Sequence, residues 1–154
     1  MDPAPDVADF FVSYAAADEV HATWIAETLE AAGHSVRIQV WDIRPGENFL
    51  LAMHRFATSC ARTVLVLSHH VVAGRPFVDL EWSAALVEDP DGSGRKLVPV
   101  RVDDCRPVGL LAAIAHIDLS GLDRDTARDR LLGGLGPVER RATDAPFPGA
   151  HPAV

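Results

Sequence analysis

One glutamate, Glu81, lies in a stretch that is otherwise typical of a buried helix. The stretch "GRPFVDLEWSAAL" covers residues 74–86, and Pro76 is well placed to open a helix. Residues four apart share a helix face, so Phe77 and Glu81 project together. The expected core stripe of this helix is Phe77, Leu80, Ala84 and Val87, which leaves Glu81 at its margin. Such an acid either stabilises the helix N-terminus or stabilises positive charge in a site, and spacing alone favours the structural role.

Two adjacent histidines, His69 and His70, follow an apolar run and could serve as metal ligands. A metal site would need a third ligand that converges with them. Neighbouring side chains on an extended chain point to opposite sides. We therefore predict an ordinary loop at these histidines and no metal site.

Several familiar catalytic signatures are absent from the sequence. The first apolar run continues into "SYAAAD", which lacks the G-x-G-x-x-G cradle of a dinucleotide-binding domain. There is also no G-x-x-x-x-G-K-[ST] loop and no G-x-S-x-G nucleophile elbow. A phosphoacceptor receiver domain would carry an aspartate at the end of the third strand, where this chain has Ser68.

The elements that position these residues alternate between strand and helix periodicity. Strands are predicted at residues 9–14, 35–41, 63–68, 96–102 and 115–119. Helices are predicted at residues 18–33, 48–60, 77–88 and 123–135, the first with Asp18 as its N-cap and Gly33 as its stop. This alternation predicts an α/β fold with a doubly wound parallel sheet.

Three strands carry further information. Apolar and polar residues alternate along 35–41, which is typical of a strand near a sheet edge, whereas 63–68 is continuously apolar, as in a central strand. Pro99 lies inside the fourth predicted strand. Proline has no N–H to donate to a neighbouring strand and normally lies at a sheet edge. Pro99 therefore conflicts with the expected pairing of this strand inside the sheet.

Composition narrows the class of protein. The chain has 154 residues, 48% of them hydrophobic, and a net charge of -8, which argues against a nucleic-acid partner. Its two cysteines have no paired spacing, its N-terminus does not resemble a signal peptide, and no apolar run approaches the roughly 18 residues of a membrane span. We expect a cytoplasmic protein without membrane association: one domain at 6–135, then a flexible Pro/Gly-rich tail or linker at 136–154.

Three stretches together resemble the Toll/interleukin-1 receptor (TIR) domain in its bacterial form. They are "DFFVSYAAAD" at 9–18, "VWDIRPGENF" at 40–49, and "VLVLSHHVVAGRPFVDLEWSAAL" at 64–86. The resemblance covers roughly residues 6–135. It implies a flavodoxin-like three-layer sandwich with a five-stranded parallel sheet in the order 2-1-3-4-5 and helices on both faces.

The resemblance implies one of two functions. The first is a glycohydrolase that cleaves the nicotinamide–ribose bond of NAD+, giving nicotinamide and ADP-ribose or a cyclic variant. NAD+ is then the substrate, no cofactor is needed, and Glu81 matches the essential glutamate. The second is a non-catalytic scaffold that signals by homotypic contact. In either case other TIR domains are partners, in a homo-oligomer or filament, and a sensor domain could lie beyond the tail.

The same three stretches and the residues beside them supply further candidate site residues. Candidate substrate-binding residues are Phe10, Ser13, Tyr14, Trp41, Asp42, Arg44, Phe49, Ser68 and Phe77. Arg44 could meet a pyrophosphate, and the serines could bind ribose or simply cap strand ends. Candidate assembly residues are Arg44, Pro45, Gly46 and Glu47, where Pro45 and Gly46 predict a turn.

Overall fold

Five parallel strands form a single sheet in the order β2-β1-β3-β4-β5. The computed structural model describes residues 7–72, 89–107, 109–137 and 146–149. The strands are β1 (Phe10–Ser13), β2 (Val36–Ile38), β3 (Arg62–Leu67), β4 (Leu97–Arg101) and β5 (Ile117–Asp118). The predicted sheet order is confirmed, with the strand from 63–68 at the centre and the strand from 35–41 at an edge.

Helices connect the strands as a doubly wound sheet requires. The α-helices are α1 (Glu19–Ala31), α2 (Gln39–Asp42), α3 (Phe49–Ser59), α4 (His69–Val72) and α6 (Arg124–Leu135). Two short 3-10 helices, η1 (Ala16–Asp18) and η2 (Gly109–Ala113), follow β1 and precede β5. The helix predicted at 77–88 lies outside the described residues. Among the described helices, none is both long and apolar enough to cross a membrane.

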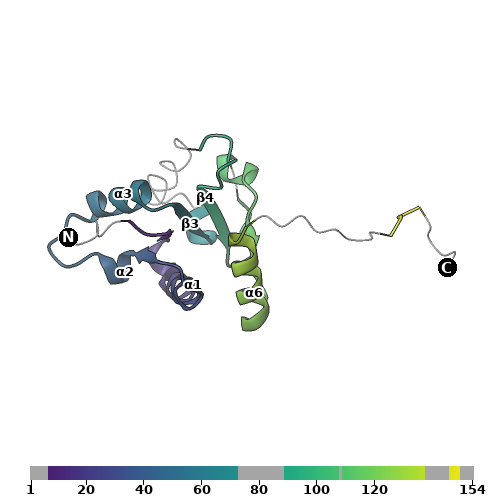
Figure 1. Ribbon diagram of the computed structural model, residues 1–154, viewed down its shortest axis with the longest axis horizontal. Helices are drawn as coiled ribbons and strands as arrows, with labels where there is room; N and C mark the ends of the chain where they lie inside the picture. The colour runs from purple at the N-terminus through teal and green to yellow at the C-terminus, as the bar shows by residue number, and fades with distance from the viewer. Residues whose placement is uncertain (1–6, 73–88, 108, 138–145, 150–154) are drawn as a thin grey trace.

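The three inner strands, β1, β3 and β4, are buried on both faces. On one face Val12, Val64 and Val100 pack with Ile25 of α1 and Leu131 of α6 in one apolar cluster. On the other face, Phe11 of β1 packs against α3, where the rings of Phe11 and Phe56 lie 5.7 Å apart. Figure 1 shows α1 and α6 on one side of the sheet and α3 on the other. The continuous apolar character of β3 is therefore explained by cover on both faces.

Helix α1 begins and ends where the sequence predicts. Gly33 has φ +96, and the N–H groups of Gly33 and His34 bond back to the carbonyls of Glu30 and Leu29. This double bond pattern around a left-handed glycine is a Schellman stop. Asp18 occupies the N-cap position of α1 as predicted, but its side chain makes no capping hydrogen bond and is buried.

The strand predicted at 35–41 is wrong beyond Ile38. The chain turns into the short helix α2, and the carboxylate of Asp42 accepts a hydrogen bond from the Ile38 N–H at 2.7 Å. An edge strand has only one neighbour to hold it extended, so a local side-chain acceptor can end the strand early. Consequently Trp41 lies on a helix with 42% of its surface exposed.

The structure resolves the conflict at Pro99. The carbonyl of Lys96 and the N–H of Val102 bond toward β3, whereas the carbonyl of Arg101 bonds toward β5. Alternate residues face alternate neighbours, so Pro99 faces the β5 side. There β5 pairs only with Val100 and Arg101. The missing N–H of Pro99 therefore falls where β5 does not extend, in keeping with the edge preference of proline.

Candidate functional site

The carboxyl ends of β1 and β3 meet where the strand order reverses. The two strands are direct neighbours, with Ser13 opposite Leu65. Ser13 ends β1 and Ser68 follows β3, and both side chains are fully buried. In open α/β sheets this reversal point is the usual ligand-binding position, because the crossovers on its two sides depart to opposite faces.

A buried carboxylate lies beside the carboxyl ends of β1 and β3. Asp18 is 4% exposed, and its Oδ2 accepts a hydrogen bond from the hydroxyl of Ser68. The same Ser68 oxygen accepts the N–H of His70 at 3.2 Å. Asp18 and Ser68 thus link the first loop to the start of α4. Through these two hydrogen bonds the Ser68 side chain holds the end of β3, which is one of the two roles that the sequence left open.

Tyr14 sits directly after Ser13 and is also buried. Burial, and secondly the negative charge of Glu19, raise the pKa of its phenol from 10.0 to about 12, against the opposing effect of a backbone hydrogen bond with Val40. Contact with Val40 ties the end of β1 to α2. The phenol is therefore neutral and lies between the end of β1 and α2.

The loop after α2 contains the predicted turn. The N–H of Glu47 bonds to the carbonyl of Arg44 at 3.0 Å, and Gly46 has φ +95. Pro45 and Gly46 occupy the central positions of this turn, where a fixed φ and a positive φ are needed. The turn is confirmed, and all four residues from Arg44 to Glu47 are exposed.

The predicted aromatic contacts are spread over different parts of the sheet. Phe10 opens β1 at its amino end, where its ring lies 5.2 Å from that of His34 and 5.5 Å from the Arg62 guanidinium. Phe49 packs against the apolar cluster under α3. Trp41 and Asp42 line a shallow cavity of about 470 Å³ beside the start of β2. Of the predicted residues that the structure describes, Ser13, Tyr14 and Ser68 lie at the reversal point.

Two further predicted residues, Glu81 and Phe77, lie outside the described residues. Their roles therefore stay predictions from the sequence. The described chain reaches Val72 at the end of α4 and resumes at Asp89.

The two histidines after β3 do not form the expected loop. They open α4, which follows directly from Ser68. His69 also meets two carboxylates that the sequence did not single out, since its N–H bonds to Asp103 at 3.0 Å and its Nε2 lies 2.6 Å from Asp104. Their signal in the sequence was weak, namely an acidic pair directly after the fourth strand.

The sheet order and the two helical layers define a flavodoxin-like α/β domain, and within that class the sequence specifies a family. Residues 10–132 match the model of the TIR domain family. Because the match spans most of the chain, the protein belongs to the TIR domain family. The expected family is therefore confirmed.

Solved structures of other TIR proteins share the fold. The TIR domain of the Toll-related receptor TRR-2 from Hydra magnipapillata has a TM-score of 0.63 at 19% identity, covering 73% of this chain and 84% of that one. A TIR-STING receptor from C. gigas gives 0.68 at 21% identity, covering 90% of this chain and 43% of that one. The same receptor in complex with 2',3'-cGAMP gives 0.65 at 23% identity, covering 85% and 41%.

These similarities establish the fold alone. The chain spans about two fifths of the C. gigas receptor, so the activity and partners of the whole receptor do not transfer. A comparison with curated protein sequences finds no match.

Proposed function

We propose that this TIR domain is an NAD+ glycohydrolase in which Glu81 is the catalytic carboxylate. The observation that carries the proposal is the polar edge at the reversal point, where Ser13, Asp18 and Ser68 lie within an otherwise apolar core. Buried polar side chains are costly unless they are bonded, so their concentration at the usual ligand position is consistent with a site. The assignment of Glu81 as the catalytic glutamate comes from the resemblance to the TIR family.

The chemistry suits a single carboxylate. Cleavage of the nicotinamide–ribose bond passes through an oxocarbenium-like state, as glycoside cleavage does. A carboxylate beside the ribose stabilises that positive charge and holds the sugar hydroxyls. Nicotinamide leaves as a neutral molecule, so no general acid is required. Arg44 would bind the pyrophosphate and Phe77 a ring of NAD+, while Ser68 and Tyr14 hold the ends of β3 and β1 in place.

The proposal includes self-assembly through the turn at Arg44–Glu47. Four exposed apolar side chains lie on the helices that flank this turn: Val40, Trp41, Leu50 and Leu51. Exposed apolar side chains that cluster in this way often mark protein contacts. A non-catalytic scaffold is the alternative function, and it rests on this same surface. Either function is expected in the cytoplasm.

One experiment separates the two functions. NAD+ consumption and nicotinamide release are measured across a range of protein concentrations for the wild type, Glu81→Gln and the matched control Glu27→Gln, which changes an exposed acid on α1. We expect turnover that rises more steeply than protein concentration, is lost in Glu81→Gln and is retained in the control.

The mass of the assemblies is measured in parallel by sedimentation. An assembled wild-type protein that releases no nicotinamide would contradict the glycohydrolase and leave the scaffold. Equal turnover in Glu81→Gln and wild type would remove Glu81 from the mechanism.

A further inference from the structure

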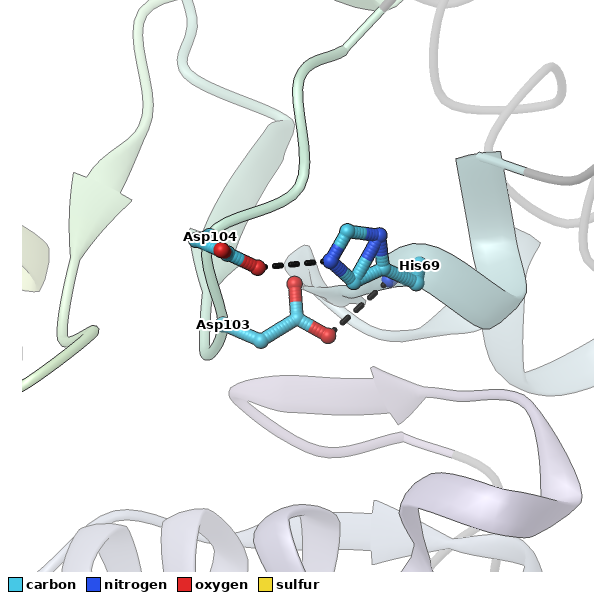
Figure 2. Close-up of side chains that lie close together, drawn as sticks. All are labelled: His69, Asp103 and Asp104. Atoms are coloured by element: carbon cyan, nitrogen blue, oxygen red, sulfur yellow. Dashed lines mark hydrogen bonds and ion pairs between the residues drawn. The ribbon is translucent and has the colours of Figure 1, made fainter.

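Three side chains from two separate segments converge at the carboxyl edge of β3 and β4. His69 opens α4 after β3, and Asp103 and Asp104 lie in the loop after β4. These strands are parallel neighbours, so their carboxyl ends share an edge. Figure 2 shows the His69 ring facing the two carboxylates. One ligand atom from each residue lies within 4.8 Å of the others.

The donor set favours a particular class of ion. An imidazole nitrogen is a preferred ligand of transition ions, and carboxylate oxygens complete many zinc sites. Hard cations such as Mg²⁺ favour all-oxygen shells. We propose that His69, Asp103 and Asp104 bind a divalent transition ion of the Zn²⁺ type, with water in the remaining coordination positions. This proposal does not depend on NAD+ cleavage.

The loop that carries the carboxylates is held in place by the backbone around it. Asp103 accepts the N–H of Cys105 at 2.9 Å and that of His69 at 3.0 Å. The guanidinium of Arg101 donates to the Cys105 carbonyl at 2.8 Å. These contacts fix one carboxylate against the start of α4, so part of the site is preformed. Preformed ligands lose less conformational entropy on binding.

The charge of Asp103 also suits a cation. Within 7–72 and 89–107, His69 is the only basic side chain in an ion pair with either carboxylate. Two neighbouring negative charges with so little compensation attract a divalent ion.

Binding requires a modest rearrangement of two exposed side chains. Zn²⁺ ligands at about 2.0–2.2 Å from the ion stand about 3.3 Å apart in a tetrahedral site. Nε2 of His69 and Oδ1 of Asp104, now 2.6 Å apart, would separate to admit the ion. Their side chains are 61% and 90% exposed, so rotamer changes allow this without repacking the core.

The test is calorimetric titration of the full chain with Zn²⁺ and, separately, Mg²⁺. The variants are His69→Gln and Asp104→Asn, whose side chains are exposed enough to change without unfolding the domain. The matched controls are His70→Gln, the exposed neighbour of His69, and Asp125→Asn, an exposed acid in the first turn of α6. Circular dichroism confirms folding of each variant.

We expect one Zn²⁺ site whose affinity falls at least about tenfold in each ligand variant and is unchanged in both controls. The proposal is overturned if the wild type binds no Zn²⁺, if the ligand variants bind as well as the wild type, or if Mg²⁺ binds the site as tightly as Zn²⁺. Loss of affinity in His70→Gln equal to that in His69→Gln would also overturn it.

Discussion

The side chains of Asp18 and Ser68, 50 residues apart in the chain, form a buried hydrogen bond. It joins the loop after β1 to the start of α4, because the Ser68 oxygen also accepts the His70 N–H. The bond crosses the point where the strand order reverses. Two short segments at the candidate site are therefore fixed relative to each other by one pair of residues.

Removing the hydroxyl of Ser68 should destabilise the domain. In Ser68→Ala the buried Asp18 carboxylate loses its donor, which costs about 1–3 kcal/mol of unfolding free energy. Asp18→Asn keeps an oxygen acceptor and should cost less than Asp18→Ala. Urea unfolding of the single and double variants measures the coupling. Additive effects within about 0.5 kcal/mol would show that the pair is not coupled.

Gly46→Ala should weaken the turn, and Gly133→Ala should not weaken helix α6. A β-carbon would meet nothing within 4 Å at either position, so sterics do not distinguish them. Gly46 has φ +95, however, where a side chain costs about 1 kcal/mol or more. Gly133 is exposed within α6, where alanine gains about 0.5–1 kcal/mol. Opposite signs in urea unfolding are expected, and equal signs would refute this account.

Pro45→His tests the same turn as an assembly surface. The side chain is exposed and only the fixed φ of proline is lost, so the unfolding free energy should fall by no more than about 1 kcal/mol and the domain should stay folded. Association measured by sedimentation should be lost, and any NAD+ turnover that depends on assembly should fall with it. Glu81→Gln should assemble normally. If Pro45→His assembles as the wild type does, this turn is not the contact surface.

Tyr14 should titrate well above an ordinary tyrosine. Its pKa is raised from 10.0 to about 12, so the neutral phenol stabilises the fold below pH 10, and that stability is lost as pH rises toward 12. The chain has one tyrosine, so tyrosinate absorbance reports Tyr14 alone. We expect a midpoint near 12 in the folded protein and near 10.0 in urea. A folded midpoint near 10.0 would mean that the phenol is solvated.

Asp118 should contribute to acid unfolding. Hydrogen bonds from Ser120 lower its pKa below 3.8, burial opposes them, and the charge of Arg101, 3.0 Å away, lowers it further. A depressed pKa gives stability that is present above pH 3.8 and lost as pH falls below it. Asp118→Asn should therefore flatten the pH dependence of unfolding in that range. An unchanged pH slope in Asp118→Asn would exclude this contribution.

Local patterns in the sequence determined much of the fold. Continuous apolar residues marked β3 as central, and period-two alternation marked β2 as an edge, because each pattern reflects how many faces are covered. Gly33 marked the end of α1, since its positive φ is a local requirement. The order of the three stretches that resemble the TIR domain also indicated the family.

Only the tertiary structure decided which distant polar groups meet. Asp18 occupies a helix N-cap position, yet its side chain accepts a hydrogen bond from Ser68 and does not cap the helix. Asp42 ends β2 early at Ile38, although periodicity continues to Trp41. His69 lacked a third ligand in the sequence and meets Asp103 and Asp104 in the fold. Hydrogen bonds across a sheet edge depend on strand register and loop path, which periodicity does not encode.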